Sequence, residues 1–263
     1  MKIPIYEAIE FKKVLQEGGS TKPWLVEVSV SDSTETYVVK VFKKDTLNQY
    51  PAVANEVFAN ILAKELGLSV PPMALVNFSD TFITTLSNQE KELIEKDIID
   101  SRVKFASLYL PNTQIYSLLS SGLDKYDRAE IYAFDNLIHN SDRKVIKPNL
   151  LLDINSEKYY LIDHELSICG IQGSYLTKIQ RGEWLYNFKN HLFFHLQYDE
   201  KDIFAHFIES LRHISVNCLD KAHHELVKHG HRTPLDSFKP YLQHLKNNSH
   251  IFEKILYRQI RNE

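Results

Sequence analysis

Hydrophobic and polar residues alternate along the first part of the chain. Trp24–Val30 carries valines on one side and Glu27 and Ser29 on the other, and Thr36–Phe42 alternates in a similar way. A period of two residues is typical of a half-buried β-strand. The link between the two segments, residues 31–35, is short and polar, so we predict a β-hairpin here.

After the predicted hairpin, the spacing between apolar residues changes from that of a strand to that of a helix. Ala52–Leu66 carries apolar residues at helical spacing, and Gly67 behind it is a typical helix C-cap. Two prolines starting at Pro71 end the helix and begin an extended segment. Beyond them, Met73–Phe78 and Thr81–Leu86 predict a second pair of strands.

The rest of the chain is predicted to be mainly helical. Residues 91–135 are predicted as helix with a loop, and helices follow from about residue 180. The predicted elements are a helix at Lys125–His139, strands at Leu150–Asp153 and Tyr159–Ile162, and helices at Asp202–Val216 and Asp220–His229. The pattern predicts an α+β fold: a β-rich N-lobe (1–90), a mainly helical C-lobe (91–263), and a ligand cleft between them.

Composition narrows the class of protein. The 263 residues are 43% hydrophobic and 25% charged, an ordinary globular mixture. The net charge is -3 without a long basic run, so we expect no direct nucleic-acid binding. No signal peptide is expected after Met1, no apolar run approaches the ~18 residues of a membrane span, and Cys169 and Cys218 are predicted to be free thiols. We therefore expect a soluble cytoplasmic protein without a membrane partner.

Two charged residues interrupt apolar elements of the first lobe. Lys40 lies in an otherwise apolar strand, on the same face as Val38 and Phe42. A lysine there must meet an anion if it is buried, and nucleotide phosphates are one such anion. Glu56, near the start of the next helix, is predicted either to hold the Lys40 ammonium or to favour the helix dipole.

Three polar residues of the second lobe lie at strand ends. Asp142 and Asn149 belong to a polar loop that runs into a strand, and Asp163 ends the next apolar strand. A hairpin would bring Asn149 and Asp163 to the same end of the strand pair. Magnesium prefers hard oxygen ligands, so these two residues are a candidate metal site. Asp142 is a candidate to orient or deprotonate an acceptor hydroxyl.

Several stretches together resemble the HipA-like kinases, in the branch with a short single-chain kinase core. The matching stretches are Tyr37–Lys40, Asn55–Ala59, Gly67–Pro71, Phe134–Arg143, Pro148–Leu152 and Leu161–Glu165. The resemblance covers about residues 18–166. It implies a bilobal protein-kinase-like fold that binds ATP and Mg²⁺.

The resemblance also implies roles for individual residues. Lys40 would contact the phosphates, Asp142 would be the catalytic aspartate, and Asn149 and Asp163 would hold Mg²⁺. The glycine-containing loop would be Gly18-Gly19-Ser20, and either Ser20 or Thr21 is the candidate for autophosphorylation. Relatives are bacterial and phosphorylate serine or threonine on proteins, and several are toxins of toxin–antitoxin pairs, so an antitoxin is an expected partner.

The chain departs from the usual kinase pattern at three places. Six residues rather than four separate Asp142 from Asn149, and Asp163 is followed by His-Glu instead of Phe-Gly. The segment starting at Gly18 is not a full GxGxxG. These differences leave Lys40, Asp142 and Asp163 as the firmest site candidates.

Two other functions stay open at the level of sequence. A small-molecule kinase of the aminoglycoside type would need an acidic acceptor pocket, for which the candidate side chains are Glu183, Asp199, Glu200 and Asp202. Its histidine lies two residues before the aspartate, whereas His139 lies three before Asp142. The other alternative is a pseudokinase or interaction module that binds nucleotide without transfer.

Two further features have ordinary interpretations. Of the twelve histidines, His224 and His229 lie five residues apart and so diverge on a helix, unlike a zinc-binding pair. Arg143, Lys144 and Lys147 are predicted either to meet an acidic substrate or phosphate, or to form an ordinary solvated loop.

Overall fold

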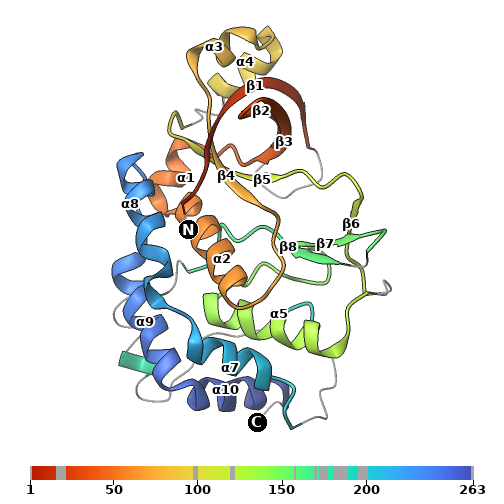
Figure 1. Ribbon diagram of the computed structural model, residues 1–263, viewed down its shortest axis with the longest axis vertical. Helices are drawn as coiled ribbons and strands as arrows, with labels where there is room; N and C mark the ends of the chain where they lie inside the picture. The colour runs from red at the N-terminus through yellow and green to blue at the C-terminus, as the bar shows by residue number, and fades with distance from the viewer. Residues whose placement is uncertain are drawn as a thin grey trace. The chain divides into compact units, whose positions relative to one another are not determined.

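Figure 1 shows a computed structural model of the protein, with a mixed α+β fold. It describes residues 2–15, 22–96, 100–118, 122–156, 158–168, 171, 177–179, 189–194 and 201–261. The chain divides into two compact units, each made of several segments: Met1–Val57, Pro71–Pro111 and Lys221–Thr233 in the first, and Phe58–Val70, Asn112–Asp220 and Pro234–Glu263 in the second. The boundary predicted at residue 90 does not coincide with this division.

Five strands of the first unit close into a small barrel (Figure 1). They are β1 (Ile5–Val14), β2 (Trp24–Val30), β3 (Ser33–Val39), β4 (Met73–Asn77) and β5 (Lys104–Leu108). Neighbours follow the order β1-β2-β3-β5-β4, all antiparallel except for the parallel pair of β1 and β4 that closes the ring. The strand predicted at Trp24–Val30 is confirmed, and its partner lies three residues earlier than predicted.

Strands β1 and β5 are not among the sequence predictions. In β1 only Ala8 is buried, so its hydrophobic alternation is weak. Strand β5 falls in the region predicted as helix with a loop, and that prediction is wrong for Lys104–Leu108. Its backbone is paired on both sides, with β3 and β4, so the conformation of this short segment is imposed by strands distant in sequence.

The barrel core is apolar and extends into a short helix, α3 (Asp80–Thr85). A strand was predicted at Thr81–Leu86, and the structure shows that this prediction is wrong. The Ser79 hydroxyl accepts a hydrogen bond from the Phe82 backbone N–H at 3.2 Å, which is an N-cap. The capped turn places the Phe82 ring 4.7 Å from that of Phe78, within the core.

Three further helices lie along the same part of the sequence. They are α1 (Lys44–Gln49), α2 (Ala52–Glu65) and α4 (Asn88–Lys96). Helix α2 confirms the helix predicted at Ala52–Leu66, and Gly67 behind it has the left-handed φ of 83° that a C-cap glycine adopts.

A three-stranded antiparallel sheet belongs to the second unit. Its strands are β6 (Thr113–Ile115), β7 (Leu150–Asp153) and β8 (Tyr159–Leu161), in the order β6-β7-β8. The hairpin of β7 and β8 is confirmed, and β6 adds an edge that the sequence did not predict. Helix α5 (Lys125–Ile138) is also confirmed and begins at a capping box formed by Asp124 and Asp127.

The C-terminal part is helical, as predicted. Its elements are α7 (Ala205–His213), the 3₁₀ helix η1 (Val216–Leu219), α8 (Asp220–Lys228), α9 (Leu235–Asn247) and α10 (Ser249–Arg261). Helices α7, α9 and α10 pack against one another (Figure 1) through buried residues such as Phe207, Leu242 and Phe252. On α8, His224 is exposed, in line with its prediction as an ordinary helical histidine.

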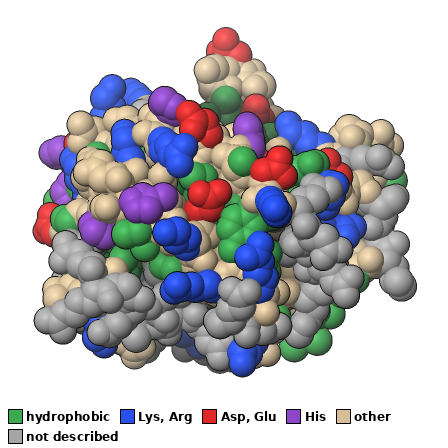
Figure 2. All heavy atoms as spheres, turned by 90° about the horizontal axis from the view of Figure 1, so that it is seen from below, with side chains coloured by type: hydrophobic (Ala, Val, Ile, Leu, Met, Phe, Trp, Pro, Cys, Tyr) green, Lys and Arg blue, Asp and Glu red, His purple; other side chains and the backbone are tan. Residues whose placement is uncertain are grey.

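Charged side chains of both signs share the visible surface. On the face in Figure 2, basic, acidic and histidine side chains are interspersed. In the described part of the chain, no helix combines the length and the apolar character needed to cross a membrane.

The capped helix α3 leads to a first prediction. Phe82→Ala removes a ring that is 2% exposed and leaves a cavity beside Phe78, so the free energy of unfolding should fall by about 3–5 kcal/mol in urea denaturation. Thr81→Ala, at an exposed position of the same helix, is the matched control and should change it by less than ~0.5 kcal/mol. Equal losses in the two variants would show that α3 does not belong to the core.

Candidate active site

The first unit pairs a lysine with a buried glutamate. Lys40 directly follows β3, and its backbone N–H donates to the Phe105 carbonyl at 2.9 Å, which continues the ladder by one residue. Its ammonium donates to Glu56 on α2, whose side chain is almost completely buried. Of the two roles predicted for Glu56, the structure confirms the ion pair with Lys40.

The β7–β8 hairpin brings Asn149 and Asp163 to one end of the second unit's sheet. Leu150 and Leu161 lie opposite each other, and the Ile162 N–H donates to the Asn149 carbonyl at 3.2 Å. Asn149 and Asp163 have left-handed φ angles of 47° and 66°, a region in which Asn and Asp are enriched. The sequence prediction that these two residues meet at a strand end is confirmed.

Asp142 joins them through two side chains of its own loop. The Asn149 amide nitrogen donates to the Asp142 carbonyl at 3.1 Å and to its carboxylate at 3.4 Å. The Lys147 ammonium lies 2.5 Å from Asp142 Oδ2 and 2.9 Å from Asp163 Oδ2. One cation therefore binds both carboxylates, and the three predicted residues of the second unit form one cluster.

Lys147 remains charged in this cluster. Partial burial by itself would lower the pKa of its ammonium, but the hydrogen bond to Asp142 and the charge of Asp163 raise it above its ordinary value. The sequence placed Lys147 only in a loop that meets a phosphate or is solvated. It did not predict a bridge between two acids.

The cluster offers the donor types that Mg²⁺ prefers. Asp142 and Asp163 supply carboxylate oxygens, and Asn149, which donates through its amide nitrogen, keeps its amide oxygen to present to a cation. Glu165 adds a buried carboxylate with an oxygen within 4.8 Å of one on Asp163. The Lys147 ammonium shows that the Asp142 and Asp163 carboxylates accept a cation, and with the neighbouring amide and carboxylate the donor set fits a magnesium site. Sequence reasoning missed Glu165, although two acids spaced by one residue after a strand were visible.

A buried ion pair lies beneath the site. Asp135 on α5 and Arg143 are both 0% exposed, and Arg143 Nε donates to Asp135 Oδ2 at 2.5 Å. The guanidinium also donates to the carbonyls of Pro148 and Asn149. Arg143 was predicted either to meet an acidic substrate or phosphate or to lie in a solvated loop, and both predictions are wrong. Its buried side chain instead fixes the backbone at Pro148 and Asn149.

Further polar groups complete this buried network. His191 Nε2 lies 2.8 Å from Asp135 Oδ2, and the Asn140 amide donates to Asp135 Oδ1 at 2.9 Å. His164, next to Asp163, lies 3.3 Å from Arg143 Nη2. Burial alone would raise the pKa of Asp135, but the Arg143 charge and the His191 hydrogen bond hold it well below its usual range. Asp135 therefore stays an anion inside the protein.

His139 has a structural position rather than a place in the cluster. Its ring is buried and packs edge-on against Tyr241, with Nε2 3.3 Å from the Tyr241 hydroxyl. Burial lowers the pKa of His139 to about 3, so the imidazole is neutral. It ends α5 with a left-handed φ of 55° and thereby turns the chain toward Asp142.

Some predicted residues lie outside the described part of the chain. These are Gly18, Gly19, Ser20, Thr21, Cys169, Glu183, Asp199 and Glu200. The hydrogen bond from Leu15 N–H to the Pro23 carbonyl, at 2.8 Å, ties together the ends of β1 and β2 on either side of the Gly18 segment. Asp202 is exposed, and Cys218 is a free, half-buried thiol whose pKa burial raises to about 11.

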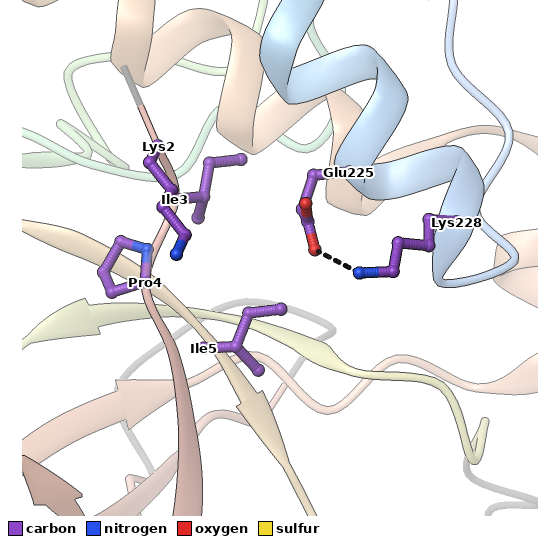
Figure 3. Close-up of a pocket in the computed structure, with 6 residues that line it drawn as sticks. All are labelled: Lys2, Ile3, Pro4, Ile5, Glu225 and Lys228. Atoms are coloured by element: carbon purple, nitrogen blue, oxygen red, sulfur yellow. Dashed lines mark ion pairs between the residues drawn. The ribbon is translucent and has the colours of Figure 1, made fainter.

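An open hollow of about 520 Å³ in the first unit contains none of the predicted site residues (Figure 3). The residues that line it are Lys2, Ile3, Pro4, Ile5, Glu225 and Lys228. Glu225 and Lys228 pair with each other across 3.8 Å. The candidate site is therefore defined by its side-chain clusters and not by this hollow.

Comparisons with known proteins agree with a kinase fold. The family model described as HipA-like kinase matches residues 9–180, more than half of the chain, so the chain belongs to the HipA-like kinase family. Among solved structures, it is similar to the crystal structure of a Helicobacter pylori proinflammatory kinase, CtkA. The TM-score is 0.53 at 12% identity over 99% of each chain, and at this identity the likeness shows the fold alone. No curated protein matches the chain in sequence.

The buried ion pair leads to a second prediction. Arg143→Met leaves the Asp135 carboxylate buried without its cation, so urea denaturation should show a loss of about 3–5 kcal/mol. Lys144→Met, at the neighbouring exposed lysine, should stay within ~0.5 kcal/mol of the wild type.

The double variant Asp135→Asn/Arg143→Met separates charge from packing. Asparagine keeps hydrogen-bonding atoms for His191 and Asn140 but carries no buried charge, so the double variant should be more stable than Arg143→Met alone. If it is less stable than that single variant, the uncompensated charge of Asp135 is not what destabilises Arg143→Met.

Proposed function

We propose that the protein is an ATP- and Mg²⁺-dependent phosphotransferase that transfers the terminal phosphate of ATP to a serine or threonine hydroxyl of a protein. The observation that carries the proposal is the cluster of Asp142, Asn149 and Asp163, in which the Lys147 ammonium contacts both carboxylates and the Asn149 amide donates to Asp142. Membership of the HipA-like kinase family supports the kinase activity, and the bilobal arrangement around the nucleotide stays a prediction.

Each cluster has a distinct role in this proposal. Lys40, held in place by Glu56, binds the phosphates, and Gly18, Gly19 and Ser20 stay predicted nucleotide-binding residues. Asp142 orients the acceptor hydroxyl and accepts its proton, while Asn149 and Asp163 hold the metal. Bound Mg²⁺ supplies positive charge that neutralises the phosphate oxygens during transfer. Ser20 or Thr21 is the proposed site of autophosphorylation.

The loop between Asp142 and Asn149 favours a protein acceptor over a polycationic small molecule. Lys144 and Lys147 form a tight turn, bonded backbone to backbone at 2.9 and 3.1 Å, with Val145 and Ile146 at its tip. Val145 is 53% exposed and Ile146 is 93% exposed. Turns usually carry Gly, Asn or Asp, so the two apolar residues at this tip are unusual. The flanking lysines would repel a cationic acceptor. The exposed apolar side chains would pack against a peptide.

An antitoxin partner, which the resemblance to the HipA-like kinases implies, stays a prediction.

Transfer of labelled phosphate tests the proposed function. With ATP labelled at the γ-phosphate and Mg²⁺, the wild type should label itself or a protein of an added lysate, and chelation should abolish the label. Asp142→Asn and Asp163→Asn should each lower the rate at least about 100-fold, because they remove the acceptor base and a metal ligand. Asp32→Asn, at an exposed turn, is the matched control and should keep the wild-type rate.

Three outcomes would contradict the proposal. A wild type that binds ATP but labels no protein would be a nucleotide-binding module. A wild type that labels kanamycin but no protein would be a small-molecule kinase. Absence of ATP binding would refute phosphoryl transfer from ATP altogether.

The exposed turn gives a separate prediction on the acceptor. Ile146→Ser should raise the KM for casein, used as a generic protein acceptor, by roughly tenfold, because burial of an isoleucine side chain contributes about 1.5–3 kcal/mol. The KM for ATP should not change. Ile154→Ser, at the exposed isoleucine of the β7–β8 turn, is the control and should leave both constants unchanged. The same KM for casein in all three proteins would exclude Ile146 from acceptor binding.

A further inference from the structure

Lys147 has an unusual position for a loop lysine. Its ammonium bridges Asp142 Oδ2 at 2.5 Å and Asp163 Oδ2 at 2.9 Å, while its side chain is 33% exposed. Its backbone is fixed by the tight turn with Lys144, at 2.9 and 3.1 Å. The turn therefore fixes the backbone of Lys147, and the ammonium lies on the oxygens assigned above to the metal and the acceptor.

A divalent cation bound to Asp163 would compete with the Lys147 ammonium for the same carboxylate oxygen. Magnesium binds oxygen ligands at about 2.0–2.1 Å and demands near-octahedral geometry, so a cation there takes up the lone pairs that now accept from Lys147. Two cations held within a few ångströms of each other also repel. One must leave for the other to bind at full strength.

We propose that Lys147 is a positioning residue that competes with the divalent cation for the Asp163 carboxylate, and that its contact with Asp142 holds the ammonium in that place. The inference rests on the proposed function, because that function assigns Asp163 to the metal and Asp142 to the acceptor. When the metal takes the Asp163 oxygens, the flexible four-carbon stem of Lys147 lets the ammonium move to the phosphate charge. Metal binding should therefore be weak in the absence of nucleotide.

Lys144 provides a matched comparison within the same turn. Its ammonium lies 3.9 Å from Asp142 Oδ1, and its side chain is 42% exposed. It has the same charge and nearly the same place in the sequence as Lys147, without the bridge between two carboxylates. A general effect of loop charge would act through both lysines, whereas competition for the metal oxygens acts through Lys147.

Titration with Mn²⁺ tests the competition without nucleotide. Free Mn²⁺ is followed by electron paramagnetic resonance in the full-length wild type and in Lys147→Met, Lys147→Arg, Lys144→Met and Asp163→Asn, each checked for folding by circular dichroism. Lys147→Met should bind Mn²⁺ about fivefold more tightly, the scale set by two partly exposed ion pairs. Lys147→Arg should return the affinity to near the wild-type value, and Lys144→Met should change it less than about twofold.

Variants of Asp163, the proposed metal ligand, complete the comparison. Asp163→Asn should weaken Mn²⁺ binding, and the double variant Lys147→Met/Asp163→Asn should lose the gain of the single lysine variant. Any of three results would overturn the proposal. The first is the same Mn²⁺ affinity in the wild type and Lys147→Met. The second is an equal gain of Mn²⁺ affinity in Lys147→Met and Lys144→Met, and the third is no Mn²⁺ binding by any variant. The titration contains no ATP, so a failure of phosphate transfer alone refutes the proposed function and leaves this result to be judged separately.

Discussion

The buried ion pair of Asp135 and Arg143 is the interaction on which the second unit's site depends. A charge without water around it must be paired and hydrogen-bonded. Asp135 satisfies this condition with Arg143, His191 and Asn140, and Arg143 in turn reaches the carbonyls next to Asn149. The orientation of the loop that carries Asp142 and Asn149 is therefore set from inside the protein, by helix α5 and a fully buried guanidinium.

Above this network, the site is arranged around opposite charges. Asp142 and Asp163 converge at the end of the β7–β8 hairpin, and two close carboxylates repel unless a cation lies between them. Lys147 is that cation in the structure, and its contacts keep the two acids oriented. The charge balance that stabilises the cluster is also the one that the proposed metal site needs, which links the stability of the loop to the chemistry proposed for it.

The first unit also holds a charged pair, with one lysine and one glutamate. Lys40 leaves the barrel strand with its ammonium directed to Glu56, whose carboxylate is buried on α2. The pair satisfies both charges and fixes the lysine in one orientation. The barrel beneath it is closed by the parallel pairing of β1 and β4, and its core includes the capped helix α3. Each unit thus presents charged groups on a rigid apolar support.

The sequence alone determined the elements whose periods are strong and local: β2, α2, α5 and the β7–β8 hairpin. It also determined the candidates Lys40, Glu56, Asp142, Asn149 and Asp163, because polar residues at the ends of apolar segments are visible without coordinates. Only the tertiary structure decided the helical conformation of α3, the pairing of β1 and β5, the burial of Arg143 and the contacts of Lys147 and Glu165. These features depend on partners far apart in the chain, and a period read along one segment carries no information about which distant group will lie against it.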